Sequence, residues 1–465
     1  MSFVSRRTVL KVLAAPMYLP VSIAGQVIAH REPKPLDPTA VTHNWSSFLG
    51  PTFNAVSTET KLSRTLPPPV VWELPTGSGY ASPVILNDRL VYIHRVGDEE
   101  VIECLHSETG SVHWRYRYGT VYEDRYGYNN GPRSSPVLDE VGGRVYTVGA
   151  EGKLLAIELD SGRVIWRKEL RQDYRVPQGF FGTASTPLIE GDSLIVNVGA
   201  TGGPTVVAFA LETGDELWHA GTEWGASYAS PIPATIHGQR RIFVFAGGES
   251  QPALGGLLVL DPADGAIDFE FPWRSRTFES VNASSPVVFN DQVFISASYR
   301  AGGALFSVSP NFEYTLDWTT PDFALHFNTP IYRDGYLYGF DGRNMGDASL
   351  ACLDAANGTI VWRATPEWTE SFELNGRVQE RLMGTARGSL LAADGDFLCL
   401  GELGHLLWLR LSPGGFEEIS RAWLFAAREC WNLPVLSHGL LYVSQNTRDL
   451  LTGSEPRLLC YDLRA

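Results

Sequence analysis

The sequence predicts an all-β protein in which eight similar four-stranded antiparallel sheets close into a ring. Three observations predict this fold. A motif ending in tryptophan recurs roughly every fifty residues, a Ser-Pro or Thr-Pro pair recurs at the same spacing, and 46 glycines and 29 prolines among 465 residues favour short strands joined by turns. Because one four-stranded sheet cannot cover both of its own faces, equal sheets in tandem pack against their neighbours, and an eight-bladed β-propeller is the expected result.

Each motif consists of a strand, a tight turn with glycine, and a returning strand that ends on a large aromatic residue. Glycine suits the turn because a short hairpin with a bulge needs a positive φ, and the indole is large enough to bury against the next sheet. The copies run from Thr109-Gly110 to Trp114, Ser161-Gly162 to Trp166, Thr213-Gly214 to Trp218, Asp264-Gly265 to Phe269, a longer copy ending at Trp318, Asn357-Gly358 to Trp362, a degenerate copy at Gly414-Gly415, and a last copy that stops after Cys460-Tyr461-Asp462.

Two more strands precede every motif, and the Ser-Pro or Thr-Pro pair opens the first of them. Proline at the first residue of a strand gives up no ladder hydrogen bond. Successive prolines are 53, 51, 44, 55 and 44 residues apart, and the last gap of 104 residues holds two units, with Gly388-Ser389 marking the copy without proline. The sequence therefore holds eight units, and their prolines are Pro83, Pro136, Pro187, Pro231, Pro286, Pro330 and Pro434.

The ring is expected to close through the start of the repeat region. The eighth unit lacks a tryptophan strand, whereas residues 70–74 around Trp72 form a strand that belongs to no unit. Pairing this strand with residues 458–462 completes the last sheet and removes both open sheet edges. We therefore assign residues 70–463 to one propeller domain, and residues 30–69 to a linker followed by a non-repeat cap around Trp45.

The first 29 residues have the three parts of an export signal: a basic start, an apolar middle, and small residues near Ala24 and Ala29. Arg6-Arg7 followed by Leu10-Lys11 resembles the twin-arginine signal, whose pathway moves folded proteins. An uncleaved membrane anchor is the alternative, although the apolar run is marginal as a span. We predict an exported, periplasmic protein whose mature chain has no transmembrane segment.

Composition excludes several classes of partner and site. The net charge of −15 argues against a surface that binds phosphate groups on this protein, and nucleic acid is therefore excluded as a general partner. The five cysteines are odd in number and form no CxxC pair, which excludes a zinc ribbon, a thioredoxin motif and a c-type haem site. We expect them to be small buried hydrophobes. The ten histidines form no HExxH motif, so the sequence predicts no metal site built on histidine.

The repeat, a small residue followed by x-Asp-x-x-Thr-Gly-x-x-x-Trp, resembles the tryptophan-docking repeat of the pyrroloquinoline-quinone (PQQ) propellers over residues 70–463. That family includes eight-bladed quinoprotein alcohol dehydrogenases and catalytically silent relatives, among them the propeller component of the outer-membrane barrel-assembly machinery. For the dehydrogenases, the resemblance implies PQQ with Ca²⁺ held by Glu and Asn oxygens, and an Asp acting as base. Many of them also carry a disulfide between adjacent cysteines, which this sequence lacks.

A central funnel is the expected place for a ligand. In a propeller, the connector that leaves the outer strand of one blade returns to the inner strand of the next, so residues just before each Ser-Pro pair converge near the axis. Arginine, asparagine, tyrosine and tryptophan side chains there suit a planar or anionic small molecule, although the same side chains also suit a water-filled channel. The candidates are Arg133, Tyr228, Asn282, His326, Asn328, Arg387, Trp431 and Asn432.

Three functions are consistent with the sequence. The first is an exported, non-catalytic binding or scaffold module that holds a protein or small ligand through its funnel or rim, which the compact blades and missing cysteine pair favour. The second is a PQQ- and calcium-dependent dehydrogenase of alcohols or sugars, which twin-arginine export favours. The third is a hydrolase or lyase on the propeller scaffold, supported only by the versatility of such folds. We expect a monomer, because a closed ring leaves no open sheet edge that needs a second chain. The connector at residues 366–388 is a candidate lid.

Overall fold

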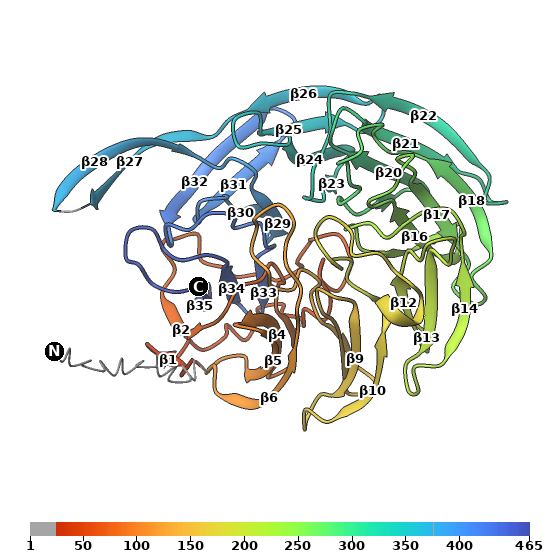
Figure 1. Ribbon diagram of the computed structural model, residues 1–465. Helices are drawn as coiled ribbons and strands as arrows, with labels where there is room; N and C mark the ends of the chain where they lie inside the picture. Colours follow the sequence, from red (N-terminus) through yellow and green to blue (C-terminus); the bar gives the residue numbers. More distant parts are fainter. Residues whose placement is uncertain (1–24, 375) are drawn as a thin grey trace, which may run out of the picture.

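The computed structural model describes residues 25–374 and 376–465, so the twin-arginine stretch lies outside the described residues. Figure 1 shows the sheets arranged radially around a central axis. Eight sheets form the ring. Seven of them contain four antiparallel strands that are consecutive in the chain, and the eighth combines three strands from the end of the chain with β2 and the short edge strand β1. A ninth, two-stranded sheet projects from the ring between blades 6 and 7. The predicted all-β, eight-bladed propeller is confirmed.

Within each of the first four blades the strands run from the axis outward in chain order. One short helix, α1 (Leu170–Asp173), follows the outer strand of blade 2. The strands are β3 (Val84–Leu86), β4 (Arg89–Val96), β5 (Glu99–His106) and β6 (Val112–Gly119) in blade 1; β7 (Val137–Asp139), β8 (Arg144–Val148), β9 (Lys153–Glu158) and β10 (Val164–Glu169) in blade 2; β11 (Leu188–Glu190), β12 (Ser193–Asn197), β13 (Val206–Ala210) and β14 (Glu216–Ala220) in blade 3; β15 (Ile232–Ile236), β16 (Gln239–Ala246), β17 (Gly256–Leu260) and β18 (Ile267–Pro272) in blade 4.

Blades 5 to 7 repeat this order, and a hairpin arm is inserted after blade 6. The strands are β19 (Val287–Phe289), β20 (Gln292–Ala297), β21 (Gly302–Val308) and β22 (Tyr314–Thr320) in blade 5; β23 (Ile331–Arg333), β24 (Tyr336–Asp341), β25 (Ser349–Asp354) and β26 (Thr359–Ala364) in blade 6; β27 (Glu367–Leu374) and β28 (Arg377–Gly384) in the arm; β29 (Ser389–Ala393), β30 (Asp396–Leu400), β31 (His405–Ser412) and β32 (Gly415–Trp423) in blade 7.

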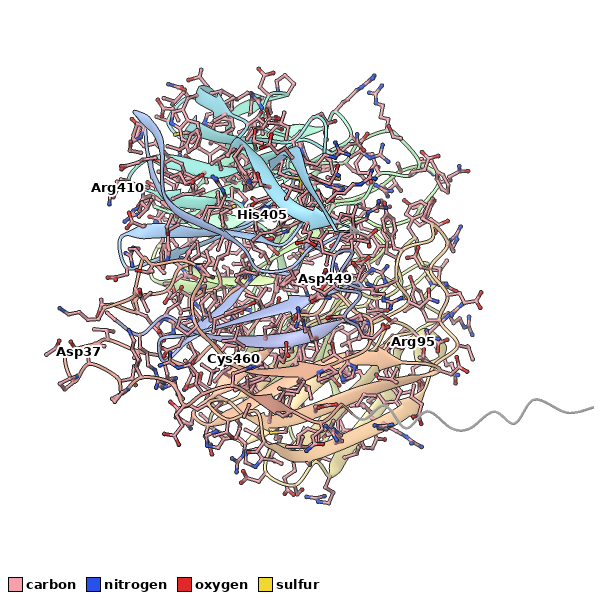
Figure 2. The ribbon with its side chains drawn as sticks, turned by 90° about the vertical axis from the view of Figure 1, so that its left-hand side faces the viewer. Asp37, Arg95, His405, Arg410, Asp449 and Cys460 are labelled. Carbon is pink, nitrogen blue, oxygen red and sulfur yellow. The ribbon has the colours of Figure 1, made fainter. Side chains whose placement is uncertain are left out.

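Blade 8 combines the two ends of the chain. It contains β33 (Val435–Ser437), β34 (Leu440–Gln445), β35 (Arg457–Asp462), β2 (Val70–Pro75) and the short edge strand β1 (Ile28–Ala29). β2 pairs antiparallel with β35, with Trp72 opposite Cys460, and Cys460 is labelled within this sheet in Figure 2. The predicted closure of the ring is therefore confirmed.

In five of the blades the tryptophan of the outer strand lies against the turn glycine of the next blade. The Trp114 indole donates to the Leu159 carbonyl over 2.6 Å. Gly162 has a φ of +75°, and a Cβ built on it would lie 2.7 Å from the Trp114 ring. Glycine is thus needed here both for its φ and for the space under the indole. Four other pairs have the same geometry: Trp72 on Gly110, Trp166 on Gly214, Trp218 on Gly265 and Trp318 on Gly358.

The Ser-Pro and Thr-Pro pairs form a belt of hydrogen bonds around the axis. In each bond the N–H of the residue before proline donates to the hydroxyl of the equivalent residue in the next blade. The pairs run from Ser82 to Ser135 (2.9 Å), Ser135 to Thr186 (3.1 Å), Thr186 to Ser230 (3.1 Å), Ser230 to Ser285 (3.0 Å) and Ser285 to Thr329 (3.1 Å). This belt explains why a hydroxyl residue precedes each of these prolines.

The segment before the repeats crosses one end of the ring. Trp45 is fully buried and bridges to Ile85 of blade 1, while the Ser57 N–H donates to the Ala392 carbonyl of blade 7 over 2.8 Å. The Glu59 carboxylate accepts the N–H groups of His438 and Gly439 of blade 8 over 2.6 and 2.8 Å. Residues 45–59 therefore tie blades 1, 7 and 8 together at this end.

The hydrophobic core lies between the blades. Val91 of blade 1, for example, is buried in one cluster with Val145 and Leu155 of blade 2. All five cysteines are buried and unpaired, as expected for small apolar residues. In the part of the chain that the structure describes, no helix is long and apolar enough to cross a lipid bilayer.

Candidate functional site

A cavity of about 170 Å³ lies on the axis, on the side where the long connectors converge. One residue from each blade lines it, and each of these residues stands three positions before the proline of its inner strand, or before Leu390 in blade 7 where proline is missing. We call these eight residues the axial ring. They are Tyr80, Arg133, Ala184, Tyr228, Ala283, Phe327, Arg387 and Trp431.

Six of the eight residues predicted from the sequence line this cavity. Four of them belong to the axial ring, and His326 and Asn432 lie one position away from it. The sequence reasoning missed Tyr80 and Phe327 because it looked for polar groups and did not fix the position relative to proline. The predicted residues that line the cavity are Arg133, Tyr228, His326, Arg387, Trp431 and Asn432.

Asn282 and Asn328 support the cavity from behind its wall. Asn282 is fully buried, and its amide donates to the Ala246 carbonyl over 2.8 Å and to the Trp273 carbonyl over 3.0 Å. The Asn328 amide donates to the Gly388 carbonyl over 2.5 Å and so links blades 6 and 7. Neither residue is among those that line the cavity.

Arg133 is held flat against aromatic rings by a buried carboxylate. Its Nη2 lies 2.7 Å from Oδ2 of Asp124, whose side chain is fully buried. Its guanidinium carbon lies 5.1 Å from the Tyr80 ring centre, within the range of a cation–π contact. The guanidinium also donates to the Asn129 and Gly131 carbonyls over 3.3 and 3.4 Å. Both terminal nitrogens of the guanidinium are therefore hydrogen-bonded, and the faces of the group are left for stacking.

Arg387 repeats this arrangement in blade 7. Its Nε donates to Glu402 Oε2 over 3.0 Å, its Nη2 pairs with the other carboxylate oxygen, and its Nη1 donates to the Arg343 carbonyl over 2.9 Å. The guanidinium carbon lies 4.8 Å from the Trp431 ring centre. Glu402 also accepts the indole N–H of Trp431 over 2.9 Å, so one buried carboxylate orients both side chains.

Trp431 is the centre of an aromatic cluster. Tyr80 stacks on it with ring centres 5.3 Å apart and planes inclined by 17°. Phe327 and Tyr128 contact it at 5.2 and 5.4 Å. Burial, followed by the neighbouring Glu429, to which the hydroxyl donates, raises the pKa of Tyr80 far above its ordinary value. Tyr80 therefore stays neutral, and the cluster offers uncharged ring surface to the cavity.

Two buried polar atoms of the cavity wall have no hydrogen-bond partner within the described residues. They are Nδ1 of His326 and Oδ1 of Asn432. His326 Nε2 lies 3.2 Å from the Tyr299 hydroxyl, and the Asn432 amide donates to the Ala81 carbonyl over 2.7 Å. Burial, and then the nearby arginines, lowers the pKa of His326 to about 3, so the ring is neutral at ordinary pH. A buried polar group gains when a ligand satisfies it.

The two alanines of the axial ring leave the space that the cavity occupies. The other six blades place a large side chain at this position, whereas blades 3 and 5 place Ala184 and Ala283 there. From the opposite end, Phe48 of the segment that crosses the ring also lines the cavity. The cavity is therefore bounded by the N-terminal segment on one side and by the connectors on the other.

Comparison with known proteins identifies the family. A family model described as outer membrane protein assembly factor BamB, one of the PQQ-like repeat models, matches residues 123–364, just over half of the chain. The chain belongs to this PQQ-like family. Comparison with curated proteins gives no match.

Three solved structures show that the PQQ-like propeller fold extends over most of the chain. BamB from Moraxella catarrhalis is 14% identical, with a TM-score of 0.55 over 85% of this chain and 99% of that one. Quinohemoprotein alcohol dehydrogenase from Comamonas testosteroni is 11% identical, with a TM-score of 0.61 over 91% and 81%. The computationally designed Ika8 protein is 9% identical, with a TM-score of 0.52 over 88% and 99%. At these identities the likeness concerns the fold.

The described donor set does not fit calcium beside a quinone. Calcium in proteins takes six to eight oxygen ligands, mostly from carboxylates and carbonyls. No aspartate or glutamate of the described chain lines the cavity. The nearest carboxylates, Asp124, Glu402 and Glu429, lie behind the wall and are committed to Arg133, Arg387 and Tyr80. Across residues 25–374 and 376–465, no group of three His, Cys, Asp or Glu side chains has metal-binding geometry.

Proposed function

We propose that this PQQ-like propeller is an exported, non-catalytic binding module that holds a planar heteroaromatic ligand in its axial cavity. The observation that carries the proposal is the composition of the axial ring. Four aromatic rings and two guanidinium groups, each fixed by a buried partner, surround the space left by Ala184 and Ala283. Such a site selects a ligand by shape and stacking, and no carboxylate of the described residues lines it.

A flat ligand fits because the wall offers ring faces. The terminal nitrogens of both arginines are hydrogen-bonded to the protein, so a ligand meets the π-faces of the two guanidinium groups together with the indole of Trp431. A heteroatom is favoured because His326 Nδ1 and Asn432 Oδ1 need a partner. A ligand N–H satisfies the asparagine oxygen, which accepts only.

Isothermal titration calorimetry on the full chain tests this proposal with three planar probes of increasing size: benzimidazole, lumichrome and PQQ. We expect at least one of them to bind, and cyclohexanol, which is not planar, not to bind. The variant Ala283→Phe fills the cavity and is expected to abolish binding, whereas Ala283→Ser keeps it. If none of the planar probes binds, or if Ala283→Phe binds as well as the wild type, the proposal is wrong.

A second set of variants tests the role of the guanidinium faces. Exchanging both members of a pair, Arg133→Met with Asp124→Asn, removes the face without leaving a buried charge. We expect at least a tenfold loss of affinity. The control exchanges Arg241→Met with Asp268→Asn, because Arg241 also stacks on a ring, Phe312 at 3.9 Å, and pairs with Asp268 outside the cavity. This control is expected to bind as the wild type does.

A dye-reduction assay distinguishes the binding module from a PQQ-dependent dehydrogenase. Protein loaded with PQQ and Ca²⁺ is mixed with alcohols or sugars and an artificial electron-accepting dye. We expect no dye reduction above the rate of PQQ and Ca²⁺ alone, because no carboxylate of the wall is free to bind the metal. Turnover that requires the protein, PQQ and Ca²⁺ together would replace the binding module with a quinoprotein dehydrogenase.

We also propose export through the twin-arginine pathway, with cleavage near Ala24. The sequence around Arg6-Arg7 supports export. Val27 packs against the core and Ile28 pairs with Glu73, so a mature chain that begins after Ala24 keeps the edge strand β1. Replacing Arg6 and Arg7 by lysine is expected to leave the precursor in the cytoplasm on fractionation. Periplasmic recovery of that variant contradicts the pathway, and sedimentation of the mature chain tests whether it is a monomer.

A further inference from the structure

The hairpin arm formed by β27 and β28 lies over the end of blade 7 and has two different faces. Trp368 and Phe372 point toward the blade, where they contact His405 at 4.8 Å and Trp423 at 5.6 Å. Figure 2 labels His405 beside the strands of the arm. Because side chains alternate along a strand, the opposite face carries Val378 and Leu382, which are exposed.

A groove of about 770 Å³ runs between the arm and the connectors of blades 7 and 8. This volume is within the range of ~300–1,000 Å³ that is typical of ligand sites. Its apolar wall includes Met345, Leu374 and Leu450, which are 47%, 41% and 60% exposed. Large apolar side chains that are both exposed and gathered around a groove indicate a partner. We call this site the arm groove.

The arm groove carries unpaired positive charge. Arg381 on β28 and Arg428 in the blade 7–8 connector both line it and are exposed, and within the described residues neither has a carboxylate within the 4.0 Å of an ion pair. The carboxylates that line the groove, Glu402 and Glu429, are already bonded to Arg387 and Tyr80. The free charge of the groove is therefore cationic, in a chain whose net charge is −15.

We propose that the arm groove binds an extended segment of a partner protein in which acidic residues alternate with apolar ones. Apolar side chains of such a segment cover Leu374 and Leu450, while its carboxylates reach Arg381 and Arg428. The two arginines come from separate elements, so they suit carboxylates spaced along a chain better than the single headgroup of a lipid. This site is additional to the axial cavity, although Tyr128, Arg387 and Trp431 line both.

The test uses a displayed library of random twelve-residue peptides, selected on the full chain. We expect the enriched peptides to be acidic and apolar. Fluorescence polarisation of enriched peptides should show at least a tenfold loss of affinity for Arg381→Glu with Arg428→Glu, and retained affinity for the matching pair of lysine substitutions. The control Arg167→Glu changes an exposed arginine on β10, far along the chain in blade 2, and should bind as the wild type does.

Four results overturn the proposal: no enrichment, an enriched pool without acidic residues, equal binding by the charge-reversed variant, or an equal loss in the Arg167→Glu control. Binding of a fluorescent fatty acid in place of the peptides, lost in the charge-reversed variant, would reassign the groove to lipid. Self-association that sedimentation shows to depend on Arg381 and Arg428 would reassign it to a second copy. Benzimidazole and lumichrome are also titrated into the charge-reversed variant. Because neither Arg381 nor Arg428 lines the axial cavity, this variant should bind the two probes as the wild type does, and the test of the arm groove stays separate from the test of the axial cavity.

Discussion

Removing the indole of Trp72 is expected to open the ring at its closing sheet. Trp72 is fully buried, so Trp72→Ala costs about 3–5 kcal/mol for the lost packing and the cavity that remains. The indole also donates to the Ser107 carbonyl over 2.9 Å, but that carbonyl keeps a bond from the Tyr442 hydroxyl over 3.2 Å. The lost bond therefore adds only about 1 kcal/mol. The expected loss in the free energy of unfolding is about 4–6 kcal/mol.

The matched control is Trp362→Ala in blade 6. This indole makes the same kind of bond, to the Ser412 carbonyl over 2.8 Å, but its side chain is partly exposed and it does not close the ring. Its loss should cost about 2 kcal/mol, because less apolar surface was buried. Urea titration followed by circular dichroism measures both variants.

Limited proteolysis distinguishes opening of the ring from general destabilisation. If β2 detaches from β35, the chain between residues 61 and 70 becomes accessible to protease. Trp72→Ala should then be cut there faster than Trp362→Ala when the two variants are compared at urea concentrations that give them the same free energy of unfolding. Equal losses of stability in the two variants, together with identical digestion patterns, would refute the assignment of Trp72 as the closing residue.

Three other variants test the repeat and one buried histidine. Gly162→Ala should cost about 2–4 kcal/mol, because the residue has a φ of +75° and a Cβ meets the Trp114 ring at 2.7 Å; a loss below 1 kcal/mol in a urea titration contradicts this. Ser135→Ala should cost about 1–3 kcal/mol because the Ser82 N–H loses its acceptor, and Ser135→Thr should restore the stability. Burial lowers the pKa of His405 from 6.5 to about 4, so the folded chain binds its proton less readily than the unfolded chain, and stability should fall by up to about 3 kcal/mol as the pH drops from 6.5 toward 4. The same fall in His405→Gln, measured by thermal unfolding at several pH values, would assign the effect to other groups.

The number of blades and the closure follow from the sequence because they depend on periodic features. The spacing of the prolines counts the inner strands, and the truncated copy after Cys460 leaves a place that only the strand of Trp72 can fill. The glycine of each turn was predicted from its φ alone. Its second role, space for the indole of the preceding blade, concerns a contact across roughly fifty residues and becomes visible only when neighbouring blades are in place.

Only part of the candidate site could be predicted from the sequence. Some residues of its wall occupy positions that the repeat fixes, whereas others are held by contacts between loops that do not repeat. Arg133 and Trp431 stand at a fixed distance before a proline, so their convergence on the axis follows from the repeat. The pairing of Arg133 with Asp124 depends on how the connector at residues 120–136 folds back on itself, and that of Arg387 with Glu402 depends on two separate loops of blade 7. The sequences of these loops do not repeat from blade to blade. The sequence therefore could not show that a buried carboxylate behind the cavity wall pairs with each of the two arginines.

The axial ring also explains how one scaffold can hold different ligands. The belt of hydroxyl groups fixes the inner strands of blades 1 to 6 at the axis, and the indole–glycine contacts join the outer strands of neighbouring blades. We therefore expect a substitution three positions before the proline to change the cavity more than the packing of the blades. In this chain the decisive positions are Ala184 and Ala283, since a large side chain at either one would close the space. The size of the cavity thus depends mainly on these eight positions, and the space exists because two of them are small.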